Sequence, residues 1–159
     1  MNTSRGPSRD AGVPAAGARR RGRERALGLL YEAESKGETA AEILDGLPLV
    51  PERYAMELFE GVMANERRID ELVGEKARSW SVNRMPVIDR QLLRLATFEL
   101  MCRPDIPYAV VIDEAVELAK EYSTEDSSRF VNGILSALGR ELRPEEATAA
   151  PLDGQVIGK

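Results

Sequence analysis

The chain has 159 residues, of which 43% are hydrophobic and 5% aromatic, with one cysteine, no histidine and a net charge of −5. These counts exclude a disulfide framework, Cys/His zinc sites and any mechanism that needs an imidazole base. No apolar run reaches the about 18 residues that span a membrane, and the N-terminal region lacks the apolar segment of a signal peptide, so we expect a cytoplasmic protein with no membrane partner. An aliphatic core with few aromatics favours one domain of packed helices, so we predict an all-α fold.

The two ends of the chain differ in composition from the middle. Residues 1–17 and 144–159 are rich in small, polar and charged residues without apolar periodicity, and we predict disordered tails there. The folded domain is then expected over 18–143. Residues 1–25 contain seven arginines and only two acidic residues, a local net charge of +5, whereas the remaining residues carry −10. The sequence therefore predicts a basic arm on an acidic body.

Helical spacing of apolar residues, with proline, glycine and capping residues at the boundaries, predicts the elements between the tails. The helix that Pro86 begins is apolar around most of its circumference, so we expect it at the centre of the fold. Gly61 predicts the close approach of another helix. The predicted helices cover 19–34, 39–44, 51–77, 86–101 and 107–122, and a last helix follows the capping residues of 123–128.

The run of arginines from Arg19 to Arg25 is the strongest chemical signal. Guanidinium groups bind phosphate oxygens in pairs and stack on unpaired bases. Cations at a helix start also oppose the helix dipole, so an anion that binds them would stabilise the helix. The run therefore indicates contact with nucleic acid. A solvated basic terminus, a calmodulin-like partner and an anionic membrane surface are the alternatives, and the weak apolar face argues against the membrane.

Two further groups of side chains have competing interpretations. Asp113, Glu117 and Glu121 share one helix face, which is typical of a solvated acidic surface, and no nucleophile or metal site accompanies them. Phe130 is either a core residue or a stacking platform for a base, and the second interpretation gains support from Arg129 and Asn132 beside it. Trp80 lies in a connector, where we expect it to be a packing anchor.

Several blocks together resemble the NusB family of bacterial transcription antitermination factors, over about residues 18–142. The family's fold is two small helical bundles packed together, which implies about seven helices here and is consistent with the six predicted above. The blocks are Ala18–Glu24 running into Leu29–Tyr31, Pro107–Tyr108 with Ile112–Lys120, Glu125–Ser127 followed by Phe130–Leu135, and the looser Ile88–Arg90.

The resemblance implies that the chain binds the single-stranded boxA element of ribosomal RNA leader RNA. The expected protein partners are the ribosomal protein NusE and the RNA polymerase antitermination complex, and the family includes both monomers and homodimers. No cofactor or metal is implied. Asp126 would border the RNA site, and Asp89 is the candidate NusE contact. By position, the implied RNA contacts are Arg19, Arg20, Arg21, Arg23, Lys120, Arg129, Phe130 and Asn132.

Under this interpretation, the arginine helix start and the first turn of the last helix form one RNA surface. Two alternatives remain. One is a helical adaptor that binds only proteins and uses its arginines for solubility. The other is a relative of the RNA-binding domain of an rRNA cytosine methyltransferase. Because the chain has no Gly-rich cofactor loop, we expect no enzyme activity.

Overall fold

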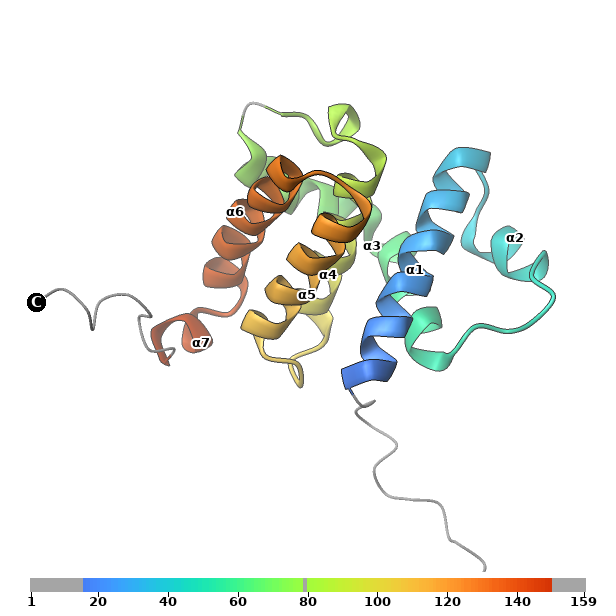
Figure 1. Cartoon of the computed structure of the whole chain (residues 1–159), viewed down its shortest axis with the longest axis horizontal. Helices are drawn as coiled ribbons and strands as arrows, with labels where there is room; N and C mark the ends of the chain where they lie inside the picture. The colour runs from blue at the N-terminus through green and yellow to red at the C-terminus, as the bar shows by residue number, and fades with distance from the viewer. Residues whose placement is uncertain (1–15, 79, 150–159) are drawn as a thin grey trace, which may run out of the picture.

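The computed structural model describes residues 16–78 and 80–149. Within these ranges the chain forms seven α-helices, one short 3-10 helix and no strand, which confirms the all-α prediction (Figure 1). None of the helices in this part of the chain is long and apolar enough to cross a membrane. The elements are α1 (Ala16–Lys36), α2 (Ala40–Asp45), α3 (Arg53–Ala77), the 3-10 helix η1 (Val82–Arg84), α4 (Val87–Cys102), α5 (Tyr108–Tyr122), α6 (Glu125–Leu142) and α7 (Pro144–Ala149).

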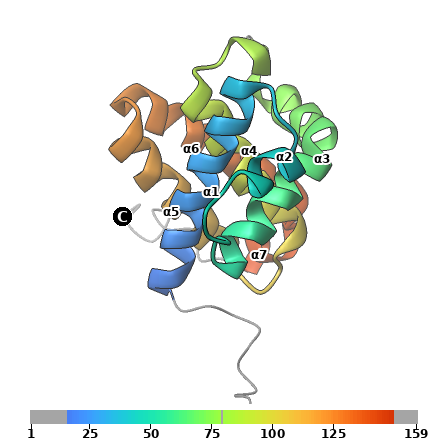
Figure 2. The same ribbon diagram turned by 90° about the vertical axis from the view of Figure 1, so that its right-hand side faces the viewer.

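The helices form two packed groups, as the family resemblance implies. In the first group α1 lies against α3, and α2 packs beside both. In the second group α5 packs on α6, and α7 follows at its end. Looking onto α1, Figure 2 shows α5 on one side of it and α2 and α3 on the other. The two groups are joined by α4, which contacts α1, α3, α5 and α6.

The central position of α4 is confirmed by its burial. Pro86 immediately precedes the helix, where its fixed φ suits a helix start, and every residue from Asp89 to Leu100 is buried. The predicted close approach at Gly61 is also present. A Cβ atom on Gly61 would lie 2.2 Å from Cζ of Phe98, so only glycine lets α3 pack this closely against α4.

The predicted tail boundaries need correction at both ends. Residues 16 and 17 already belong to α1, whereas 1–15 and 150–159 lie outside the described residues. The C-terminal tail was expected from residue 144, but 144–149 form α7. This short helix is fixed by Glu146, whose carboxylate accepts from the backbone N–H of Tyr108 at 2.7 Å and from Arg143 at 2.9 Å. The contact with Tyr108 spans 38 residues and leaves no signal in local apolar periodicity.

Candidate nucleic-acid interface

The first turns of α1 place two arginines on an exposed face. The side chain of Arg20 is 53% exposed, and its Nε donates to Glu114 of α5 at 3.1 Å. This hydrogen bond and the charge of Glu114 raise the pKa of the Arg20 guanidinium. The side chain of Arg21 is 66% exposed and lies 4.0 Å from Glu52. Arg19 is half-buried. Arg20 and Arg21 therefore offer guanidinium groups that a phosphate can reach.

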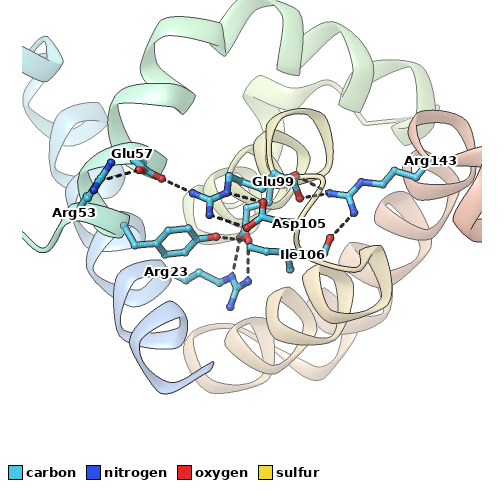
Figure 3. A network of polar contacts seen from close by, with 9 residues as sticks. Arg23, Arg53, Glu57, Glu99, Asp105, Ile106 and Arg143 are labelled. Atoms are coloured by element: carbon cyan, nitrogen blue, oxygen red, sulfur yellow. Dashed lines mark hydrogen bonds and ion pairs between the residues drawn. The ribbon is translucent and has the colours of Figure 1, made fainter. Parts of the chain in front are cut away.

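Arg23, another predicted RNA contact, is buried, so in this structure its guanidinium is not on the surface. Its side chain is 2% exposed, and its Nε and Nη2 donate to the two oxygens of Glu99 at 2.7 and 2.8 Å (Figure 3). The hydroxyl of Tyr54 donates to the same carboxylate at 2.8 Å, and burial, with the charge of Glu99, raises the pKa of Tyr54. The cause is the register of α1, because Gly22, Arg23 and Ala26 all lie on its buried face.

A hollow beside Arg20 brings α1 and α5 together. Its volume is about 290 Å³, and Arg20 of α1 and Lys120 of α5 both line it. Lys120 is exposed and lies 3.4 Å from Glu117, one turn earlier on the same helix. A positive group from each helix therefore borders one depression on the surface, together with acidic groups. The lining residues are Arg20, Glu117, Leu118, Lys120 and Glu121.

The first turns of α6 carry the other predicted contacts. The helix begins after Thr124, whose side chain accepts from the backbone N–H of Ser127. The side chain of Arg129 is 74% exposed, and its nearest acidic partners, at 3.6 and 4.0 Å, are Glu125 and Asp126. Asn132 is exposed one turn further on. Exposed pairs of this kind are weak, so they leave Arg129 able to turn toward a phosphate.

The two halves of the predicted site lie toward different ends of α5. Arg20 contacts Glu114 in the second turn of that helix, whereas α6 begins after α5 has ended at Tyr122. Eight residues of helix correspond to a rise of roughly 12 Å. Lys120 lies between these two points. Arg20, Lys120 and the start of α6 therefore follow one another along α5.

Asp89, the candidate NusE contact, is buried in this structure, and its role in partner binding stays a prediction. It is 3% exposed, and its two carboxylate oxygens accept from the hydroxyls of Ser123 and Ser127, each at 2.8 Å. These bonds tie the start of α4 to the connection between α5 and α6. An acidic residue in a first helical turn also favours the helix dipole, which is why its sequence position looks the same in either role.

Trp80 and Glu114 are the side chains at this surface that sequence reasoning underrated. Trp80 does pack against another residue, as predicted, because its ring lies 6.4 Å from that of Phe130, yet 52% of its surface remains exposed. Glu114 is 94 residues from its partner Arg20. The spacing of residues along the chain does not show that Trp80 lies close to Phe130. An aromatic residue in a polar connector was nevertheless a signal that could have marked Trp80 as a candidate site residue.

Comparison with known proteins identifies the family that the sequence matches. Residues 20–140 match the model of the NusB family. A transcription antitermination protein NusB from Saccharopolyspora erythraea is 50% identical over 145 residues, which cover 85% of this chain and 97% of that protein.

Solved structures agree with this match. A NusB structure from T. maritima is 37% identical, with a TM-score of 0.73 over 86% of this chain and 98% of that one. A chain in a crystal structure of the antitermination factors NusB and NusE in complex with dsRNA is 26% identical, with a TM-score of 0.68 over 79% of this chain and 98% of that one. The family match and these identities over most of the chain show that it belongs to the NusB family.

Proposed function

We propose that this chain is a transcription antitermination factor that binds the boxA element of ribosomal RNA leader RNA together with the ribosomal protein NusE, within the RNA polymerase antitermination complex. The names of its relatives and the NusB–NusE–RNA assembly of one structural neighbour support this proposal. The observation that carries it is the row of exposed cations along α1, α5 and α6. That row consists of Arg20, Lys120 and Arg129, and Arg21 is exposed next to Arg20 on the side of α1 that faces Glu52.

The chemistry of this row suits an RNA backbone. A guanidinium can hold two phosphate oxygens at once, and the phosphate contacts supply most of the affinity. The acidic groups beside Arg20 and Lys120 partly neutralise them, so affinity for arbitrary RNA should be modest. Base preference must then come from contacts near Phe130 and Asn132, where unpaired bases can stack and form hydrogen bonds.

The proposal is tested by charge reversal at the exposed arginines of α1. Binding of fluorescent boxA RNA and of a scrambled RNA is measured by anisotropy at two salt concentrations, with and without NusE. Arg20→Glu and Arg21→Glu should each weaken boxA binding. The slope of log affinity against log salt should fall by about 0.7 for each phosphate contact that is lost.

Arg68→Glu is the matched control. Arg68 is 59% exposed and lies near one acidic neighbour, Glu71, on α3. The net charge changes equally in all three variants, so a general effect of charge would weaken RNA binding equally in all of them. That equality, or equal affinity of the unchanged chain for boxA and scrambled RNA in the presence of NusE, would reject the proposal.

The proposal gives the chain a binding role and no catalytic one, acting in the cytoplasm where transcripts are made. Support for it comes from the relatives, which are named for antitermination. A methyl-transfer assay on ribosomal RNA with the chain alone should therefore give no product. Turnover in that assay would favour the methyltransferase alternative.

A further inference from the structure

Trp80 and Phe130 form two walls of a small apolar hollow. Their ring centroids lie 6.4 Å apart and the ring planes are inclined by 60°, an edge-to-face arrangement. Because the rings do not stack on each other, the half-exposed indole keeps surface available to a planar ligand. The hollow has a volume of about 240 Å³. Its lining residues are Trp80, Pro86, Asp89, Asp126, Ser127 and Phe130.

Hydrogen bonds from neighbouring residues hold the segments that line the hollow in place. Nη1 of Arg90 donates to the backbone carbonyls of Val82, Asn83 and Met85 at 3.2, 3.3 and 2.8 Å, which fixes the connector that follows Trp80. Asp89 fixes the start of α6 through its bond from Ser127. A site whose walls are already positioned loses less entropy when a ligand enters.

We propose that this hollow binds one unpaired nucleobase of the RNA, with Trp80 as the stacking surface and Phe130 as the second wall. The inference rests on the proposed RNA-binding function and deepens it, because it adds Trp80 to the contacts and names a base subsite. Stacking on aromatic side chains is how single-stranded nucleic acids are held without full sequence readout.

Three features favour a base over an apolar side chain of a protein. Arg129 directly precedes Phe130 and is 74% exposed, so a cation stands beside the hollow where the phosphate of a bound nucleotide would need one. The volume lies below the roughly 300 Å³ at which pockets for drug-sized ligands begin, so it suits a single ring system. The hollow also lies at the start of α6, which follows directly after the end of α5 that carries Lys120.

Asp126 gives the hollow a preference among bases. Its side chain is 96% exposed and Arg129 lies 4.0 Å away, so its oxygens remain able to accept hydrogen bonds at the rim. A carboxylate accepts from exocyclic amino groups, which adenine, guanine and cytosine carry and uracil lacks. The subsite should therefore favour an amino-bearing base over uracil.

The first test uses the intrinsic fluorescence of the full chain. Trp80 is its single tryptophan, so emission excited selectively over tyrosine reports on this site alone. Titration with boxA RNA should quench the emission, and the quenching should saturate at the same RNA concentration as the anisotropy of labelled RNA. This measurement needs no variant, so it does not depend on whether a substituted chain folds.

The second test locates the base. Trp80→Ala should weaken boxA binding on the order of tenfold, and Trp80→Phe should retain most of the affinity. RNAs that carry one abasic nucleotide at successive positions are then compared. At one position, the missing base should lower the RNA affinity of the unchanged chain about tenfold. The same abasic RNA should bind Trp80→Ala as tightly as intact RNA does, because both changes remove the same contact. Tyr31→Ala is the control, because Tyr31 is an aromatic residue of similar exposure on α1. In the absence of NusE, this variant should bind RNA as the unchanged chain does.

The outcomes separate this inference from the proposed function. Tight RNA binding with unchanged tryptophan emission, and with no abasic position coupled to Trp80, would overturn the base subsite and leave RNA binding intact. An emission change caused by NusE and not by RNA would identify a protein side chain as the occupant and would also overturn it. If the unchanged chain fails to bind boxA RNA even with NusE, the proposed function fails and the subsite fails with it.

Discussion

Arg23 of α1 and Glu99 of α4 form a two-point ion pair in the core, with N–O distances of 2.7 and 2.8 Å and side chains 2% and 1% exposed. Burial works against the charge of Arg23, but the hydrogen bonds and charge of Glu99 outweigh it and raise the pKa of the guanidinium. Tyr54 of α3 donates to the same carboxylate. One acidic group on the central helix therefore joins α1 and α3 to the rest of the core.

Removing one member of this pair should destabilise the fold strongly. In Arg23→Met the charge of Glu99 stays buried without its main partner, and we expect the free energy of unfolding to fall by about 3–5 kcal/mol. Urea denaturation followed by circular dichroism measures the loss. Arg20→Met removes an exposed arginine from the same helix and should leave the unfolding midpoint nearly unchanged.

The double variant Arg23→Met with Glu99→Leu measures the interaction energy between the two side chains. Replacing both charges by apolar groups removes the buried charge altogether, so the double variant should be more stable than the sum of the two single losses predicts. Strict additivity of the two losses would show that the two side chains contribute independently and would contradict the pair as the cause.

Gly61 should tolerate no side chain, although it lies in the middle of a helix. In Gly61→Ala the added Cβ would lie 2.2–2.8 Å from three ring atoms of Phe98, and displacing that buried ring should cost about 1–3 kcal/mol of unfolding free energy. Gly74→Ala is the control on the same helix, because nothing lies within 4 Å of its Cβ. That change should stabilise the chain by about 0.5–1 kcal/mol, and thermal unfolding distinguishes the two signs.

The helices were predictable from the sequence because their signals are local. The predicted 86–101 and 107–122 correspond to α4 at Val87–Cys102 and α5 at Tyr108–Tyr122, since a proline precedes each helix and fixes its start. The burial of α4 followed from its apolar circumference. Features that depend on the spacing of residues along the chain could therefore be predicted, and the capping box of Thr39 and Glu42 is one of them.

The candidate site was harder to predict because charge alone does not reveal burial. Arg23 belongs to the same arginine run as Arg20, and the two differ only in which face of α1 they occupy. The partner that decides the role of Arg23, Glu99, is 76 residues away. The burial of Asp89 was not foreseen for the same reason, since its partners Ser123 and Ser127 lie 34 and 38 residues further along. Such pairings arise from tertiary packing, which a single sequence does not display.

Arg143, which directly follows α6, should be essential for the stability of the fold. It is 8% exposed, and its guanidinium donates to the backbone carbonyls of Glu99, Leu100, Arg103 and Ile106, at the end of α4 and in the turn that follows it. Figure 3 shows Arg143 beside Glu99 and Ile106. Arg143→Met would remove the side-chain donor from all four carbonyls. Those of Glu99 and Arg103 would keep one backbone N–H donor each, but those of Leu100 and Ile106 would lose the donor described here, at a cost of about 2–5 kcal/mol.

Two further variants test the geometry of Arg143. Arg143→Lys should recover little of the stability, because one ammonium group cannot reach four carbonyls that a planar guanidinium spans. Arg140→Met changes an exposed arginine one turn earlier in α6 and should be nearly neutral in the same urea titration. If Arg143→Lys were as stable as the unchanged chain, the positive charge would be sufficient and the planar shape of the guanidinium would not matter.

Asp105 should make part of the stability depend on acidity. Hydrogen bonds from Arg103, at 3.1 and 3.0 Å, lower the pKa of Asp105 below its ordinary value of 3.8. A carboxyl whose pKa is lower in the folded chain stabilises the fold above its unfolded pKa, and this contribution is lost as the pH falls through the folded value. Between neutral pH and about pH 2, the unfolding free energy of Asp105→Asn should therefore fall less steeply than that of the unchanged chain. Asp113→Asn, at an exposed carboxylate of α5, should retain the original slope, and a slope reduced equally in both variants would assign the acid sensitivity to net charge instead.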